Sequence, residues 1–174
     1  TYRDQSPTVH ETAWIGAGAK LIGDVTVAQE ATIWYNTVLR ADLAAITIGK
    51  RTNIQDSCIG HVNSGQPLVI GDYVSVGHGA IVHGCTIGQG TLIGMGAIVL
   101  NGAEIGEYAL VGAGAVVTEN KRIPPRTLVL GTPARVVREL TDDDLERMRC
   151  NAADYVERCR EQRSRTYRLE SDTK

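Results

Sequence analysis

The chain has 174 residues, a length that fits one domain. Hydrophobic residues make up 43% and charged residues 22%, which excludes an intrinsically disordered protein. Apolar runs are only a few residues long, so we expect no membrane span, and residues 1–9 carry no signal-peptide pattern. The net charge of −2 argues against a nucleic-acid-binding protein. We therefore expect a cytoplasmic protein with neither nucleic-acid nor membrane partners.

The composition is unusual in its core-forming residues. There are 19 glycines and no phenylalanine, and aromatic residues total only 5%. A core without large aromatic fillers is expected to be narrow and built from Val, Ile, Leu and Ala. The four cysteines have no C-x-x-C spacing, which excludes a zinc ribbon or a thioredoxin motif, and we expect free thiols. They are Cys58, Cys85, Cys150 and Cys159.

An internal repeat begins near the N-terminus, where an aliphatic residue recurs at every sixth position. The residues in phase are Val9, Ile15, Leu21, Val27, Ile33 and Leu39, and then Ile87, Ile93, Val99, Ile105, Val111, Val117, Ile123 and Val129. A period of six fits neither a helix nor a simple strand, but it is the hexapeptide repeat of a parallel β-helix. Three hexads close one triangular coil of about 18 residues, so Val9 to Leu130 gives about seven coils. We predict an all-β fold, a left-handed parallel β-helix.

The remaining elements follow in chain order. The repeat slips out of phase after Gly60, which predicts a loop over His61–Pro67. Glycines follow the repeat residues at positions 88, 94, 106 and 112, and we expect them to adopt positive φ in tight turns. Pro133 ends the repeat, and Thr141 is a candidate N-cap of an amphipathic helix reaching about Arg165. The prediction is one domain, with a β-helix over residues 1–140 and, over 141–174, a C-terminal α-helix packed along it and a tail.

Three of the four histidines have a spacing that indicates a metal site. His61 and His83 are 22 residues apart, one coil plus the loop insertion, so they should stack on adjacent rungs of one face. His78 should lie on another face or corner of the same coil. One prism cannot easily bring all three together, whereas three prisms around a threefold axis can. Three imidazoles and water form a common catalytic zinc set, while His10 stands alone and is expected to be solvated.

Several motifs together resemble the gamma-class carbonic anhydrase family. They are Leu39-Arg40-Ala41-Asp42, Arg51-Thr52-Asn53-Ile54-Gln55-Asp56, Gly60-His61-Val62, Val76-Gly77-His78, the stretch from Val82 to Gly88, and Gly94-Met95-Gly96-Ala97. The resemblance covers the whole chain, including Asn151 to Val156 in the predicted helix. It implies a homotrimer with active sites at the subunit interfaces.

The resemblance also implies a ligand set for a metal ion. His61 and His83 of one subunit and His78 of the next would bind Zn²⁺, and three imidazoles also suit Fe²⁺ or Co²⁺. Zinc-bound hydroxide would attack CO₂ to give bicarbonate. Arg40 and Asp42 match an R-x-D pair that would form an ion pair across the trimer interface. The alternative is that this pair has only a structural role.

Four further residues would complete the catalytic set that the resemblance implies. Asn53 and Gln55 match positions near the metal-bound water, where Gln55 would orient the hydroxide or the substrate. Asp56 would hold this polar network in place. Tyr155 matches a helix tyrosine that reaches the mouth of the site, although its spacing fits core packing equally well.

The sequence departs from the best characterised branch of the family at two positions. That branch has a glutamate after the R-x-D aspartate, where this chain has Leu43. It also has an acidic loop after the first histidine ligand, where this chain has the short, uncharged segment 63–67. Those acids are linked to proton transfer, so CO₂ hydration here would be slow or would need another shuttle.

Two other functions stay open from the sequence. Many hexapeptide-repeat proteins act on acyl-CoA, as acyltransferases or thioesterases, and a transferase of this kind needs one histidine as general base. The third reading is a catalytically weak trimeric assembly protein.

Overall fold

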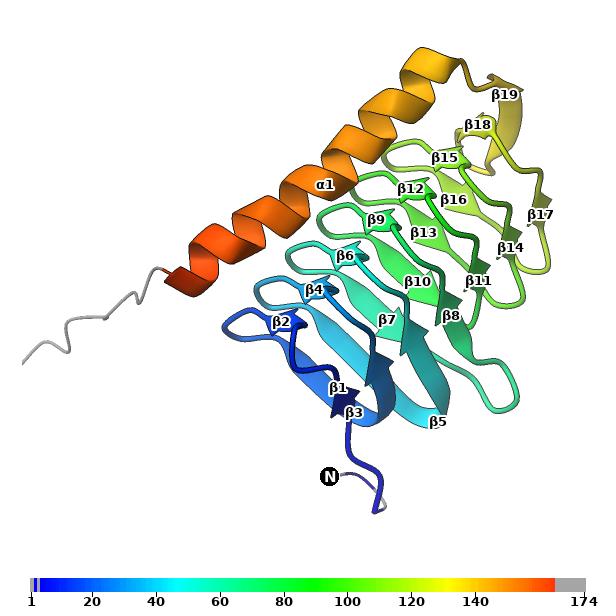
Figure 1. Cartoon of the computed structure of the whole chain (residues 1–174). Coiled ribbons are helices and arrows are strands. Elements are labelled where there is room, and N and C mark those ends of the chain that lie inside the picture. The colour runs from blue at the N-terminus through cyan, green and yellow to red at the C-terminus, as the bar shows by residue number, and fades with distance from the viewer. Residues whose placement is uncertain (1, 3, 165–174) are drawn as a thin grey trace, which may run out of the picture.

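The computed structural model describes residue 2 and residues 4–164, and the predicted tail to Lys174 lies outside the described residues. The chain winds into a stack of coils with parallel strands on three faces and one helix alongside (Figure 1). The face that lies alongside the helix, called the third face, has seven parallel rungs. They are β2 (Trp14–Ile15), β4 (Thr32–Ile33), β6 (Asn53–Ile54), β9 (Ser75–Val76), β12 (Leu92–Ile93), β15 (Leu110–Val111) and β18 (Thr127–Leu130). The predicted β-helix of about seven coils is confirmed.

The other two faces share two long strands, β3 (Lys20–Val27) and β5 (Val38–Ile48), which bend from one face into the next. The first face continues from their first halves through β7 (Ile59–His61), β10 (Ile81–His83), β13 (Ile98–Val99) and β16 (Val116–Val117). The second face joins their second halves to β1 (Thr8–Val9), β8 (Leu68–Ile70), β11 (Thr86–Ile87), β14 (Glu104–Ile105) and β17 (Arg122–Ile123). The predicted loop lies between β7 and β8, closed by a bridge between Asn63 and Gln66.

The repeat residues form the interior of the prism. All eight positions from Ile87 to Val129 are at most 3% exposed, as the period of six predicts. At the open N-terminal end the prediction is wrong for Val9, which is 39% exposed because no coil lies beyond it. The tryptophans lie outside the prism on the third face, where Trp34 is buried and meets Trp14 at a ring-centroid distance of 5.0 Å.

The glycines that follow the repeat residues have a different role from the expected one. Gly88, Gly94, Gly106 and Gly112 do not have positive φ; the left-handed turn residues lie two positions further on, for example Gly96 and Gly114. A Cβ on Gly94 would lie 2.4 Å from the backbone nitrogen of Ala113 on the next coil. These glycines are needed for close approach of neighbouring coils and not for turn geometry.

The C-terminal part begins with a strand that the sequence did not reveal. Strand β19 (Arg135–Glu139) pairs antiparallel with β18 at the end of the stack. Helix α1 (Asp142–Ser164) then runs back along the third face, as predicted (Figure 1). Leu145 and Met148 pack against Leu92, Leu110 and Leu128 of that face. In the described part of the chain, no helix combines the length and the apolar character that crossing a membrane requires.

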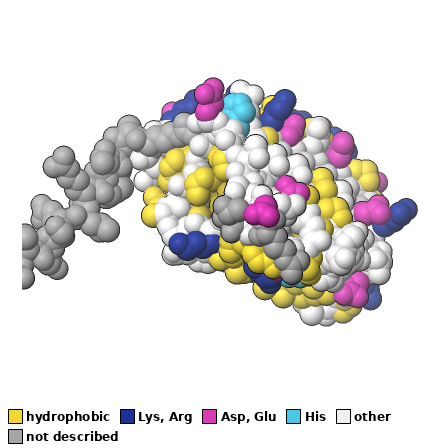
Figure 2. Space-filling view, turned by 90° about the horizontal axis from the view of Figure 1, so that it is seen from below, with side chains coloured by type: hydrophobic (Ala, Val, Ile, Leu, Met, Phe, Trp, Pro, Cys, Tyr) yellow, Lys and Arg dark blue, Asp and Glu magenta, His cyan; other side chains and the backbone are white. Residues whose placement is uncertain are grey.

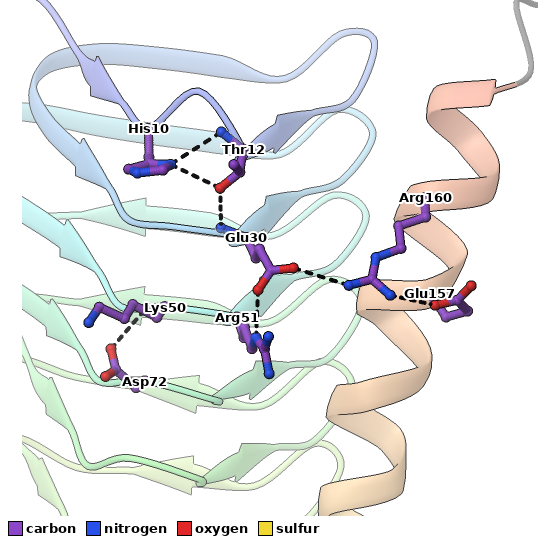
Figure 3. Close-up of polar contacts among 8 residues, drawn as sticks. All are labelled: His10, Thr12, Glu30, Lys50, Arg51, Asp72, Glu157 and Arg160. Atoms are coloured by element: carbon purple, nitrogen blue, oxygen red, sulfur yellow. Dashed lines mark hydrogen bonds and ion pairs between the residues drawn. The ribbon is translucent and has the colours of Figure 1, made fainter.

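Ion pairs hold the helix against a corner of the prism. Glu30 accepts hydrogen bonds from Arg51 of the prism at 2.7 Å and from Arg160 of the helix at 3.2 Å (Figure 3). The hydrogen bond from Arg51 lowers the pKa of Glu30 and outweighs partial burial, which raises it. On the face seen in Figure 2, basic and acidic side chains are interspersed.

The helix begins with a reciprocal cap. The Thr141 hydroxyl accepts from the Asp144 amide, and the Asp144 carboxylate accepts from the Thr141 amide at 2.9 Å. Arg138 beside Asp144 holds the pKa of that carboxyl well below its usual range. We expect Thr141→Ala to lower the free energy of unfolding by about 1 kcal/mol, because one helix N–H loses its acceptor. Urea denaturation followed by circular dichroism measures this. Thr118→Ala, at an exposed position after β16, is the control, and an equal effect of both variants would contradict the cap.

Candidate metal centre

His61 and His83 lie on adjacent rungs of the first face, as predicted. They are register partners on β7 and β10, and Arg40 on β5 is the partner of His61 on the other side. His61 Nδ1 and His83 Nε2 face each other at 2.9 Å. Both side chains are partly buried at the edge of the face.

The outer nitrogens of both rings have partners that fix where the protons lie. His61 Nε2 is 2.8 Å from Asp42 Oδ1, and a carboxylate only accepts, so Nε2 carries the hydrogen. His83 Nδ1 contacts the side-chain oxygen of Asn101, which also only accepts. In the neutral rings, His61 Nδ1 and His83 Nε2 therefore both carry lone pairs. Two lone pairs facing each other repel, so the 2.9 Å approach requires a cation between them, either a proton that makes one ring an imidazolium donor or a metal ion.

This donor set fits a zinc ion. Two imidazole nitrogens bound to one tetrahedral zinc stand about 3.3 Å apart, given bond lengths of about 2.0–2.1 Å. The 2.9 Å separation here needs to open only slightly. Histidine ligands in metal sites also donate their second N–H to a carboxylate or a carbonyl, as His61 does to Asp42 and His83 to Asn101.

Asp42 connects the metal-binding edge to Arg40. The two side chains are hydrogen-bonded within one chain, two residues apart on β5, while the expected ion pair across a subunit interface stays a prediction. Partial burial raises the pKa of Asp42, but the hydrogen bond from His61, a backbone hydrogen bond and the charge of Arg40 together lower it. The carboxylate therefore stays ionised and keeps its acceptor role toward His61.

His78 lies elsewhere, directly after β9 on the third face. Its Nδ1 is 2.8 Å from Asp56 Oδ2, so Nδ1 donates and Nε2 keeps a lone pair. Tyr155 of α1 lies 3.2 Å from that Nε2 and donates its hydroxyl hydrogen. Tyr155 also packs edge-to-face on Trp34, so its hydroxyl contacts His78 while its ring belongs to the apolar stripe. Burial raises the pKa of Tyr155.

A buried row of side chains supports His78 from behind. Gln55 Oε1 accepts from the His78 backbone amide at 3.2 Å, and Gln55 Nε2 donates to Asn53 Oδ1 at 3.0 Å. Asn53 Nδ2 in turn donates to Ser75 Oγ at 2.8 Å. Asn53 and Gln55 are 1% and 5% exposed, so both amides are committed to these partners within the chain. In this arrangement their direct effect is to fix the segment that carries His78.

The two histidine groups do not meet within one chain. Across residues 2 and 4–164, no three His, Cys, Asp or Glu side chains come together in a way that could hold a metal ion. His61 and His83 lie at the edge of the first face, and His78 follows a strand of the third face. This agrees with the expectation that one prism cannot assemble the ligand set.

The remaining predicted features are simple to place. His10 is exposed, as expected for a solvated histidine. Its Nδ1 lies 2.9 Å from the Thr12 hydroxyl (Figure 3). Leu43, at the position of the missing glutamate, is 51% exposed. Asn101 is not among the site residues predicted from the sequence. Its signal is a spacing of 18 residues from His83, one full coil.

Cys58 and Cys85, which lie near the histidines in the sequence, are buried and therefore unreactive. Burial raises the pKa of Cys58 to about 11 and that of Cys85 to about 12. We expect iodoacetamide to modify native Cys150, which is exposed, and to leave Cys58 and Cys85 unmodified until the protein is denatured. Unfolded thiols ionise near their ordinary pKa of 9.0, while the folded protein keeps these protons. The free energy of unfolding should therefore fall as the pH rises above that value. Mass spectrometry of the labelled protein tests the first point, and rapid native labelling of Cys85 would contradict it.

Comparison with known proteins identifies the family. The family model described as bacterial transferase hexapeptide (six repeats) matches residues 84–119. A Methanocaldococcus jannaschii protein named a probable carbonic anhydrase is 54% identical over 142 residues, covering 82% of this chain and 89% of the relative. The mitochondrial gamma carbonic anhydrase 1 of Arabidopsis thaliana is 41% identical over 158 residues, covering 87% of this chain and 58% of the relative. The chain belongs to the gamma-class carbonic anhydrase family.

A solved structure shares the architecture of this chain. A crystal structure of a Bacillus cereus protein, named as a candidate acetyltransferase, superimposes with a TM-score of 0.93 at 45% identity. It covers 94% of this chain and 95% of the other. This gamma-class member therefore shares its whole architecture with a protein named for different chemistry, and function has to be argued from the site.

Proposed function

We propose that the protein is a gamma-class carbonic anhydrase-like metalloenzyme that hydrates CO₂ reversibly to bicarbonate. The observation that supports this most directly is the 2.9 Å approach of His61 Nδ1 to His83 Nε2, while the other ring nitrogens are held by Asp42 and Asn101. In the proposal, His78 of a neighbouring subunit supplies the third ligand through Nε2, since Asp56 occupies its Nδ1. Zinc is the proposed ion, and Fe²⁺ or Co²⁺ suit the same donors.

The outward side chains of the three faces support a homotrimer. The second face presents exposed and mostly polar residues, namely Thr8, Thr26, Thr47, Val69, Thr86, Glu104 and Arg122. The third face is covered by α1. The first face presents an aliphatic column, Val38, Ile59, Ile81, Ile98 and Val116, beside the histidine edge. Ile59 is 40% exposed in the single chain, so contact between subunits at this face buries apolar surface and brings His61 and His83 to the interface.

Each residue of the site has a role in the proposed reaction. His61 and His83 of one subunit and His78 of the next would hold the zinc ion, which when bound would supply a hydroxide near neutral pH for the hydration of CO₂. Asp42 keeps the His61 ring oriented, and Gln55 and Asn53 hold the segment that carries His78. With His78 Nε2 committed to a metal ion, the Tyr155 hydroxyl that contacts this nitrogen at 3.2 Å would be available to donate to an oxygen of bicarbonate. Leu43 cannot carry a proton to buffer, so we expect a slow enzyme.

The four free cysteines favour a reducing, cytoplasmic compartment.

Metal content per chain, measured with the native mass, tests the proposal. The expected result is about one divalent ion per chain in a trimer, together with CO₂ hydration above the buffer rate that chelation abolishes. A metal-free trimer that cannot be loaded with zinc would overturn the anhydrase mechanism. A fully loaded trimer without hydration activity would leave the assembly function in its place.

The second candidate is an acyl-CoA-dependent transferase or thioesterase. The hexapeptide transferase model over residues 84–119 and the name of the Bacillus cereus protein favour it. A general base needs one histidine, so the paired lone pairs of His61 and His83 would have no purpose in this function. Saturable turnover of acetyl-CoA by metal-free protein would support the second candidate over the first.

A further inference from the structure

We propose that Asn101 is a positioning residue that fixes the proton of His83 on Nδ1 and so directs Nε2 toward the metal. The inference rests on the proposed function, because it assigns a role in metal binding. Asn101 follows His83 by 18 residues and lies one coil further along the stack. No motif of the sequence analysis includes it.

The orientation of the Asn101 amide is set by a third residue. Asn101 Nδ2 donates to Glu119 Oε1 at 3.3 Å, and that carboxylate can only accept. The amide must therefore turn its nitrogen toward Glu119 and its oxygen toward His83. Asn101 Oδ1 lies 2.5 Å from His83 Nδ1, so the amide oxygen is in close contact with the ring. Glu119, Asn101 and His83 form a chain of donors and acceptors with only one consistent direction.

The backbone around Asn101 holds this geometry. The Asn101 carbonyl accepts from the Asn120 amide at 2.9 Å, and the Gly102 amide donates to the Gly84 carbonyl at 2.8 Å. The Asn101 side chain lies over Gly84, where a Cβ would come within 2.9 Å of Asn101 Oδ1. Gly84 also has positive φ and directly follows the ligand His83. The chain therefore leaves space at position 84 for the Asn101 side chain.

Without the Asn101 acceptor, His83 loses its constraint. The ring can then carry its proton on Nε2, the atom that faces His61, and this tautomer cannot bind a metal through Nε2. Partners of this kind in other metal sites change metal affinity about 10–100-fold when they are removed. We expect a loss of that size for zinc.

The experiment compares two variants with the wild-type trimer. Asn101→Leu removes the acceptor at similar size. The double variant Asn101→Asp with Glu119→Gln exchanges the amide and the carboxylate between these two positions. The carboxylate at position 101 then accepts from His83 and from the amide at position 119, so every hydrogen bond can form again. Zinc affinity is measured by competition with a chromophoric chelator, and the visible spectrum of the Co²⁺-loaded protein reports ligand geometry. Native mass and thermal midpoint show whether each variant is folded and assembled.

The expected result is about 10–100-fold weaker zinc binding and an altered Co²⁺ spectrum for Asn101→Leu, with both restored in the exchanged pair. Wild-type affinity in Asn101→Leu would overturn the proposal, and so would an exchanged pair as weak as Asn101→Leu. A wild-type protein that binds no divalent ion would instead defeat the proposed function and this inference with it. The two failures are therefore distinguishable.

Discussion

An equal mixture of His78→Ala and His83→Ala chains should recover metal that neither variant binds alone. Each variant lacks one ligand at every interface of its own trimer. In a mixed trimer, an interface is complete where a His78→Ala chain supplies His61 and His83 and a His83→Ala chain supplies His78. With random assembly from co-refolded chains, about one quarter of the wild-type metal content should return. Metal analysis of the purified trimer fraction measures it.

The control for this experiment is His10→Ala, which removes an exposed histidine whose partner is Thr12. It should keep full metal content. Stoichiometric metal in His78→Ala alone would show that the third ligand is wrong. No recovery in assembled mixed trimers would show that the site lies within one chain. Either result contradicts a site shared between subunits.

Gly94→Ala should destabilise the fold, even though alanine normally stabilises a position with ordinary φ. Replacing glycine at a compatible φ gains about 0.4–1 kcal/mol by restricting the unfolded chain. Here the new methyl group would lie 2.4 Å from Ala113 N and 2.6 Å from the carbonyl carbon of Gly112. Both are backbone atoms of the next coil and cannot rotate away. Overpacking of this kind costs about 1–3 kcal/mol, so the sign of the effect is reversed.

Gly112 provides a matched control, one coil further along the same column. The nearest atom to a Cβ there is Leu130 Cδ2, the end of a side chain that is 43% exposed and can move. Gly112→Ala should therefore cost much less than Gly94→Ala. The difference in urea midpoint at constant m-value measures it. Equal effects, or a more stable Gly94→Ala, would contradict the close-approach role of these glycines.

The sequence predicts the interior of this fold well because each coil repeats the same local solution. Ile93 and Val111 are buried for the same reason, and a period of six is enough to identify them. Val9 fails because burial there depends on a further coil. Strand β19 was missed because its residues do not continue the repeat and are all exposed. The role of Gly94 depends on the distance between coils, which the sequence does not contain.

The site could be predicted only in part for a similar reason. The coil length places His61 above His83 and separates His78 from both, and the structure agrees. Hydrogen-bond direction depends on several coils at once, so the Asn101 contact could not be predicted from motifs. Arg40 and Asp42 pair with each other on one strand of the single chain, and the predicted pair across the interface stays a prediction because it needs a second subunit.

The reversed strand at the end of the stack also limits how long the stack can become. A parallel β-helix adds rungs whose strands all run in one direction, and an open last rung is a template for a further copy. Strand β19 covers the last third-face rung with an antiparallel partner that carries Arg135, Arg138 and Glu139 (Figure 1). A second chain arriving at this end meets reversed hydrogen-bonding groups and exposed charges instead of a matching rung. On the third face, the C-terminal end of the stack therefore offers no matching parallel edge to a second copy of the chain.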